Sequence, residues 1–399
     1  MTRHPVRHWT INGDFTALEP TGVARYAREV TVALDTLVAE GHPLAQDLAV
    51  TLVIPRALRE PLPLRALAVE QLAEFRSPRL PQFWVQVQLP FRVRGGLLSF
   101  CNLAPVSVMR QIVCIHDLNT WTSPESYSLI FRLAHRIILP LLGQRCHTIT
   151  TVSEFSRDQL VQFCVAPEDK IVVTYNGHEH AKRWGSHRIA ARAAGNRPFV
   201  LGLGRAHRHK NTGLLWRLAD GLDEMGLDIH VAGRFDAAAF AIEGRGPPRN
   251  LRLLGRIDDE EFGRALRDAL CFLFPSRTEG FGLPGIEAMA LGCPLVSADV
   301  PCLREIYGDA ALYAGPDEPT AWIAAIDRLR RDRVLREEFV LRGLARAERY
   351  SWRTIAEQYL ELMAEADGWP RRPAGLAPIR ERPDPRERQE PSPGRRAVG

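Results

Sequence analysis

The sequence predicts an α/β protein with two Rossmann-like, doubly wound domains that face each other across a central cleft. Three observations indicate this architecture. The chain has 399 residues, 45% of them hydrophobic, which is more than one hydrophobic core usually supports. Short apolar runs alternate with amphipathic stretches, as in parallel sheets flanked by helices. This alternation lapses once near the middle of the chain and then starts again.

The first run of alternation predicts an N-terminal domain over residues 1–185. Residues 177–197 lack periodicity, so we place the interdomain linker there. The expected strands are 8–12, 49–54, 111–115, 148–152 and 171–174, and the expected helices are 22–40, 126–142 and 153–164.

The second run predicts another doubly wound domain over residues 186–350. A last helix over 351–368 is expected to pack back on the N-terminal domain. The segment 369–399 has seven prolines, eight arginines and little to bury, which is typical of a disordered tail. The expected strands are 198–203, 227–232, 251–254, 270–274, 294–297 and 311–314, and the expected helices are 211–225, 259–268, 284–291, 319–331, 333–349 and 352–367.

The positive charge of the chain gathers in this tail. It contains eight of the 52 basic and four of the 47 acidic residues, so the remainder holds 44 basic and 43 acidic residues. No single domain is basic, and we therefore expect no nucleic-acid partner. Clustered arginines in the tail would favour weak contact with anionic lipid head groups.

Cysteine spacing and hydropathy indicate a cytoplasmic protein, at most peripheral at the inner face of the cell membrane. The seven cysteines form no Cys-x-x-Cys pair, as expected for reduced thiols. The N-terminus has no charged leader followed by an apolar run, and no segment reaches the ~18 apolar residues of a spanning helix.

A glycine-rich segment between an expected strand and an expected helix predicts an anion site. Such a turn presents free backbone N–H groups and the positive end of the helix dipole, which suits a diphosphate. Two carboxylates eight residues apart can hold a ribose diol and the hydroxyls of a sugar. Alternatively, both carboxylates only stabilise the helix start. The residues are Glu279, Gly280, Phe281, Gly282, Leu283 and Glu287.

This segment resembles the family-4 retaining glycosyltransferases with the GT-B fold, in which seven residues separate two such glutamates. Residues 202–212 resemble the family's strand-loop-helix ending in Lys-Asn, where Arg205 and Lys210 would neutralise the donor pyrophosphate. Fixed positive charge suits a leaving group that gains negative charge in the transition state. Both could instead be surface residues, but the chain has only three lysines, so Lys210 within the motif is informative.

The resemblance extends into the first domain and assigns it to the acceptor. Gly22 matches a glycine-rich loop facing the donor phosphates, although ordinary helix capping is the alternative. His116 in Ile-His-Asp matches the histidine beside the transferred sugar, although a lone histidine is often structural. The most similar group is bacterial mannosyltransferases of O-antigen or exopolysaccharide synthesis. Gly285 departs from it, since relatives often carry a bulkier residue there.

The resemblance implies a retaining hexosyltransferase acting on a nucleotide diphosphate sugar, with a polyprenyl-linked or oligosaccharide acceptor. Mannose from GDP-mannose is the leading donor and a UDP-sugar the alternative. No cofactor or metal is expected, since the chain lacks Asp-x-Asp. The catalytic candidates are His116, Arg205, Lys210 and Glu279. The donor-binding candidates are Gly22, Arg205, Lys210, Glu279, Gly280, Phe281, Gly282, Leu283 and Glu287.

For the mechanism we favour front-face transfer, with double displacement through Glu279 as the alternative. Three other functions compete: a nucleotide-sugar epimerase, a non-catalytic sugar-nucleotide-binding subunit, and a nicotinamide oxidoreductase suggested by Gly202-x-Gly204 but lacking the third glycine. The acceptor would be recognised by loops such as 56–95, whose aromatic residues are core candidates or contacts for a lipid-linked acceptor. These aromatics are Phe83, Trp84 and Phe91.

Overall fold

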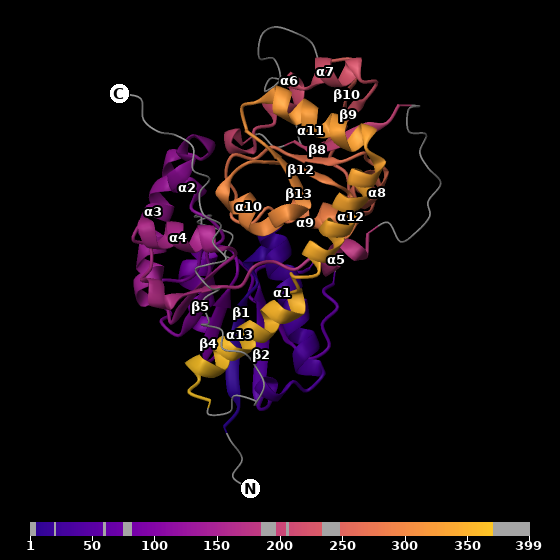
Figure 1. Cartoon of the computed structure of the whole chain (residues 1–399). Coiled ribbons are helices and arrows are strands. Elements are labelled where there is room, and N and C mark those ends of the chain that lie inside the picture. The colour runs from indigo at the N-terminus through magenta and orange to yellow at the C-terminus, as the bar shows by residue number, and fades with distance from the viewer. Residues whose placement is uncertain are drawn as a thin grey trace.

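The computed structural model describes residues 5–19, 21–58, 61–74, 82–184, 197–204, 207–233 and 248–369. The chain forms two lobes, each built on a parallel sheet with helices on its faces (Figure 1). This confirms the predicted α/β, doubly wound architecture. In the described part of the chain, no helix combines the length and apolarity needed to cross a bilayer.

The N-terminal lobe contains a seven-stranded sheet in the order β3-β2-β1-β4-β5-β6-β7, with every neighbouring pair parallel. Chain order reverses between β1 and β4, which makes this the topological switch point of the sheet. The strands are β1 (Arg7–Asn12), β2 (Leu48–Ile54), β3 (Ala68–Gln71), β4 (Gly96–Ser99), β5 (Gln111–Cys114), β6 (Thr148–Thr151) and β7 (Ile171–Val173). The helices are α1 (Gly22–Ala39), α2 (Asn119–Thr122), α3 (Leu129–Arg145), α4 (Glu154–Gln162) and α5 (Glu179–Lys182).

The C-terminal lobe contains a six-stranded parallel sheet in the order β10-β9-β8-β11-β12-β13, with its switch point between β8 and β11. The strands are β8 (Phe199–Leu203), β9 (Asp228–Ala232), β10 (Leu251–Gly255), β11 (Phe272–Phe274), β12 (Leu295–Ala298) and β13 (Ala311–Ala314). The helices are α6 (Gly213–Arg217), α7 (Ala219–Glu224), α8 (Asp259–Asp268), α9 (Leu283–Ala290), α10 (Pro301–Tyr307), α11 (Pro319–Arg331) and α12 (Arg333–Ala347). A last helix, α13 (Trp352–Ala366), follows them in the chain.

Most predicted elements are present within one to three residues, and the exceptions have local causes. The strands β3 and β4 were not expected, because each has only four residues and neither alternates between apolar and polar positions. The predicted helix 211–225 is divided at Leu218 into α6 and α7. The short helices α2, α5 and α10 were also missed, and α5 lies within the predicted linker 177–197.

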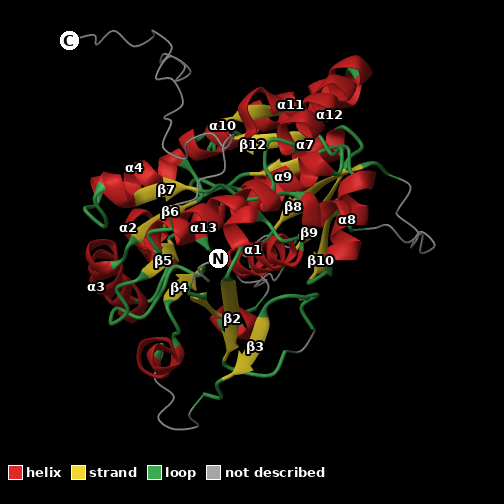
Figure 2. Cartoon of the chain, turned by 90° about the horizontal axis from the view of Figure 1, so that it is seen from below, coloured by secondary structure: helices red, strands yellow, loops and turns green. Residues whose placement is uncertain are grey.

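The last helix, α13, leaves the C-terminal lobe and packs along α1 of the N-terminal lobe, and the two lie side by side in both views (Figures 1 and 2). Buried hydrogen bonds join α13 to this lobe. The hydroxyl of Tyr359 lies 3.0 Å from the hydroxyl of Tyr26 and 2.7 Å from that of Thr150. Near its C-terminal end, Asp367 accepts a hydrogen bond from the indole of Trp9 at 3.0 Å. The C-terminal segment therefore ties the two lobes together.

Candidate active site

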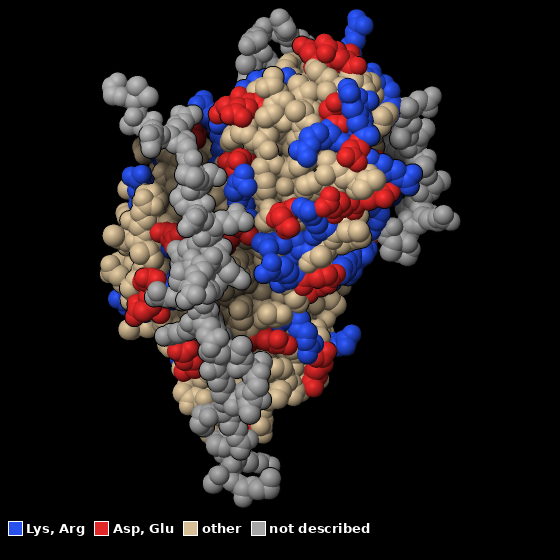
Figure 3. Space-filling view, in the orientation of Figure 1, with Lys and Arg blue, Asp and Glu red and all other residues tan. Residues whose placement is uncertain are grey.

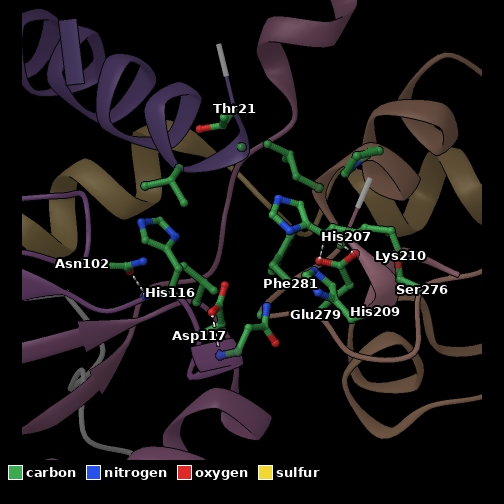
Figure 4. A pocket seen from close by; sticks show the side chains of 18 of the residues that line it. Thr21, Asn102, His116, Asp117, His207, His209, Lys210, Ser276, Glu279 and Phe281 are labelled. Carbon is green, nitrogen blue, oxygen red and sulfur yellow. Dashed lines mark hydrogen bonds and ion pairs between the residues drawn. The ribbon is translucent and has the colours of Figure 1, made fainter. Parts of the chain in front are cut away.

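A pocket of about 430 Å³, lined by both charged and apolar side chains, lies between the two lobes at the carboxyl ends of both sheets (Figure 4). Loops after β1, β4 and β5 face loops after β8 and β11 across it, so both topological switch points open onto the same space. Such crevices are where open α/β sheets bind ligands. Its lining includes Gly22, Asn102, His116 and Asp117 from the N-terminal lobe, and His209, Lys210, Glu279, Gly280, Phe281, Gly282 and Leu283 from the C-terminal lobe.

Lys210 and Glu279 form an ion pair on the C-terminal wall of this pocket. The Lys210 ammonium donates to both carboxylate oxygens, at 2.7 and 2.8 Å. Burial would raise the pKa of Glu279, but the Lys210 charge and hydrogen bonds lower it overall, so the carboxylate stays ionised. The pair brings one fixed cation and one strong hydrogen-bond acceptor to the place where two motifs far apart in the sequence meet.

The turn before α9 is shaped by glycines. Gly282 has a φ of +85°, in the left-handed region that favours glycine. A Cβ on Gly280 would lie 2.3 Å from the backbone oxygen of His116, so this glycine lets the two lobes meet closely. Phe281 and Leu283 are buried in the core as well as lining the pocket. The N-terminal end of α9 is thereby placed at the pocket wall.

Tyr307 explains why the chain tolerates glycine at position 285. A Cβ on Gly285 would lie 2.3 Å from the Tyr307 hydroxyl, so the tyrosine fills the space that a larger residue would take. The same hydroxyl donates to the Gly282 carbonyl at 2.6 Å. Tyr307 thus occupies the space beside Gly285 in the C-terminal lobe and also supports the glycine-rich turn.

Glu287 lies apart from the pocket that contains Glu279. It is buried one turn inside α9, where it contacts His180 Nε2 at 2.8 Å, and it is 3.6 Å from Arg25 Nε. Arg25 extends from α1 and also binds Asp259 of α8 with two hydrogen bonds, at 2.6 and 3.0 Å. Glu287 therefore belongs to a charged network that joins the lobes. Neither Arg25 nor His180 could be assigned a role from the sequence, because neither has a spacing relationship to Glu287.

His116 is buried in the pocket wall that the N-terminal lobe forms, and its ring is held in one orientation. Its Nε2 lies 2.7 Å from the Phe100 carbonyl, which can only accept, so this nitrogen carries a proton. Tyr26 packs edge-on against the ring with centroids 4.8 Å apart. Asp117 follows at the pocket wall, and burial raises the pKa of its carboxyl, although the Asn119 amide and Lys210 oppose this rise. Figure 4 shows His116 and Asp117 on the opposite side from Lys210 and Glu279.

An aromatic stack, which sequence analysis also missed, joins the lobes at one side of the pocket. Tyr127 stacks on Phe131 of α3 at 5.5 Å, and on His207 of the C-terminal lobe at 5.6 Å. Its centroid is 6.3 Å from that of His209, and Ser126 bonds to both histidines. Burial and the Lys210 charge lower the pKa of His209 to about 4, so it is neutral near pH 7. The stack holds the loop that carries Lys210 against the N-terminal lobe.

The remaining sequence candidates are placed as follows. Gly22 lines the pocket at the start of α1, where Thr21 caps the helix by accepting from the Ala24 amide at 3.3 Å. Trp84 is a core residue whose indole donates to the Leu72 carbonyl at 2.7 Å, whereas Phe91 is 85% exposed. Arg205 and the tail beyond Trp369 lie outside the described residues, so their predicted roles stay predictions. Among the residues with described positions, no group of three or more His, Cys, Asp or Glu is arranged to hold a metal ion.

Two facing Rossmann-like lobes, with a pocket between the carboxyl ends of their sheets, define a protein with the GT-B fold of glycosyltransferases. The model of the family glycosyl transferases group 1 matches residues 186–345. Among curated proteins, the chain is 30% identical over 272 residues to O-antigen chain mannosyltransferase B of Escherichia coli, covering 64% of this chain and 70% of that relative. The chain belongs to the glycosyl transferases group 1 family and is a glycosyltransferase.

Two further comparisons agree. The chain is 27% identical over 252 residues to O-antigen chain mannosyltransferase RfbU of Salmonella typhimurium, covering 62% of this chain and 69% of that relative. Among solved structures, sucrose-phosphate synthase from Thermosynechococcus elongatus superposes with a TM-score of 0.70 at 17% identity, over 91% of this chain and 99% of that one. The structural similarity confirms the predicted GT-B fold.

Proposed function

We propose that this glycosyltransferase moves mannose from GDP-mannose, with retention of anomeric configuration, to a polyprenyl-linked or oligosaccharide acceptor in surface polysaccharide synthesis. The donor sugar is inferred from the O-antigen mannosyltransferases to which the chain is similar. The observation that carries the proposal is the convergence of Lys210, Glu279 and the N-terminal end of α9 on one wall of the pocket between the lobes.

The donor diphosphate would lie along this wall. The Lys210 ammonium and the backbone N–H groups of the glycine-rich turn supply positive charge fixed in place before the reaction, which stabilises negative charge as it develops on the leaving group. Arg205 is proposed to contribute a second cation. Glu279 would accept hydrogen bonds from sugar hydroxyls and keep Lys210 oriented.

We propose front-face transfer. The bond between the anomeric carbon and the donor phosphate oxygen breaks, and a bond from the acceptor hydroxyl oxygen forms on the same face of the sugar. The acceptor proton passes to the departing phosphate oxygen, so the products are a nucleoside diphosphate and the glycoside. His116 lies on the opposite side of the pocket, in the N-terminal lobe, and would position the sugar. Closure of the lobes would keep water from the reactive donor.

The donor is tested by thermal stabilisation of the full chain with GDP, UDP, GDP-mannose and UDP-glucose, with EDTA present to check that no metal is needed. A ligand that binds the folded state raises the melting temperature. GDP compounds should stabilise the protein, and Lys210→Ala should weaken the shift. Glu287→Gln tests the predicted second donor contact while keeping an acceptor for His180. The exposed Glu337→Ala on α12 is the matched control.

The outcomes separate the competing functions. Stabilisation by UDP compounds alone would replace the proposed donor. An epimerase would convert the donor sugar without an acceptor, and a non-catalytic subunit would bind the donor without turnover. NMR of the product's anomeric proton then decides retention, and an inverted product would refute front-face transfer. If no nucleotide stabilises the protein, the donor-site proposal fails.

A further inference from the structure

The outward face of α3 is unusually apolar for a helix at the protein surface. Of the 18 exposed large hydrophobic side chains in the described residues, six lie on this one helix. Five are aliphatic and between 39% and 81% exposed, and four of these follow one another at four-residue intervals along one face. The five are Leu129, Ile130, Leu133, Ile137 and Leu141. A concentration of this kind marks an interaction surface.

The charge of α3 has a single sign. Its sequence contains three arginines and no aspartate or glutamate. Arg132 and Arg145 donate hydrogen bonds to the backbone carbonyls of Pro124 and Val106. The flank of the molecule where Figure 1 places α3 is mostly tan in Figure 3, with some Asp and Glu (red) as well as Lys and Arg (blue) around it. On α3 itself, the exposed aliphatic side chains are accompanied by arginines and by no carboxylate.

The helix α12 of the C-terminal lobe provides an internal contrast. It also exposes large aliphatic side chains, Val334 and Leu341. Two of its arginines, however, pair with glutamates of the same helix: Arg333 with Glu337 at 2.8 Å, and Arg342 with Glu338. Exposed apolar residues therefore occur elsewhere on this protein, but those of α12 lie on a helix that also carries arginine–glutamate ion pairs.

The opposite face of α3 leads into the pocket. Phe131 and His135 both line the cavity that contains Lys210 and Glu279. Leu139 and Leu142 are buried in the core of the N-terminal lobe. One side of the helix thus touches the candidate active site while the other faces outward. A surface bound to the outward face would lie beside the pocket.

We propose that the outward face of α3 docks this enzyme on an anionic lipid bilayer. The aliphatic side chains would enter the boundary between head groups and acyl chains, while the exposed Arg136 and Arg145 contact anionic head groups. The charge favours this occupant, since a helix with exposed arginines and no carboxylate of its own complements a negative membrane surface. For a lipid-linked acceptor, which rests on the function proposed above, the head group would enter the pocket while the lipid stays in the bilayer.

The experiment measures binding of the full chain to vesicles by co-sedimentation, with phosphatidylcholine alone or mixed with phosphatidylglycerol. We expect binding to the anionic vesicles only. The triple variant Ile130→Ser, Leu133→Ser, Ile137→Ser should bind about tenfold more weakly for each side chain removed. Arg136→Glu should weaken binding to anionic vesicles. The matched control Val334→Ser, Leu341→Ser on α12 should bind like the wild type.

Two results would overturn the proposal. One is wild-type binding that is absent or unchanged by the α3 substitutions. The other is a wild-type dimer in size-exclusion chromatography that the triple variant converts to a monomer, since α3 would then contact a second copy of the chain. The melting temperature of each variant with GDP-mannose is measured in parallel. It checks folding and reports donor binding independently, so failure of membrane docking and failure of the proposed function can be told apart.

Discussion

Replacing Lys210 by Met should destabilise the protein and slow transfer for two separable reasons. In the folded state its ammonium contacts both oxygens of Glu279, whose exposed fraction is 9%. Removing one partner of a fully buried ion pair costs about 3–5 kcal/mol. Because the Lys210 side chain retains 24% exposure, we expect a loss of about 2 kcal/mol.

The pH dependence follows from the same pair. Lys210 holds the pKa of Glu279 below its usual 4.5, so the pair stabilises the fold above that pH and loses its effect as pH falls through the lower, folded-state pKa. Without Lys210, the effect of burial is opposed only by the smaller effects of Ser276 and His209, so the pKa of Glu279 should rise. The variant should therefore lose stability relative to the wild type at neutral pH, and the difference should shrink in acid.

A double-mutant cycle separates stability from catalysis. Adding Glu279→Gln to Lys210→Met removes the unpaired charge and should recover most of the lost stability, measured by urea unfolding. It should not recover transfer, because the fixed cation remains absent, and removal of one such electrostatic contact lowers the rate by about 10²–10³-fold. The assay is kcat/KM for transfer from the donor identified by thermal stabilisation.

Lys182→Met is the matched control. Its partner Glu348 is 62% exposed on the side chain and Lys182 itself 46%, so this surface pair should contribute less than about 1 kcal/mol. Equal destabilisation by the two single substitutions would refute the argument from burial. Full recovery of transfer in the double variant would refute the role proposed for Lys210.

Three further predictions concern contacts between the lobes. Arg25→Gln should loosen the ligand-free protein, because Glu287 loses its link to α1, and small-angle scattering should show a larger radius of gyration; an unchanged radius would contradict this. Tyr127→Ala should weaken donor binding about tenfold by calorimetry through loss of the stack on His209, whereas Tyr127→Phe should not. Burial raises the pKa of Glu305 to about 7, so wild-type stability should fall as pH rises from about 4.5 to about 7. This fall corresponds to about 3 kcal/mol of stability, and Glu305→Gln should flatten it in melting curves recorded across that pH range.

The sequence by itself was sufficient for the fold class and for the position of two loops. Alternating apolar runs and helical periodicity are local properties, so the amino-acid order alone locates the strand-loop-helix units around Lys210 and Glu279. Parallel strands in turn place both loops at the carboxyl edge of one sheet. Their convergence into an ion pair is consistent with that rule.

Only the tertiary structure decided which side chains meet between the lobes. Arg25 and Glu287 lie far apart in the chain, and so do Glu305 and the start of α4, whose amides it caps at 2.8 and 2.9 Å. Tyr127 and His209 are likewise distant in sequence and meet only across the pocket. These contacts depend on how two separately folded sheets are oriented, which periodicity within either half cannot specify. The outward face of α3 also required the structure, because an apolar helix pattern does not reveal which of its faces the fold leaves uncovered.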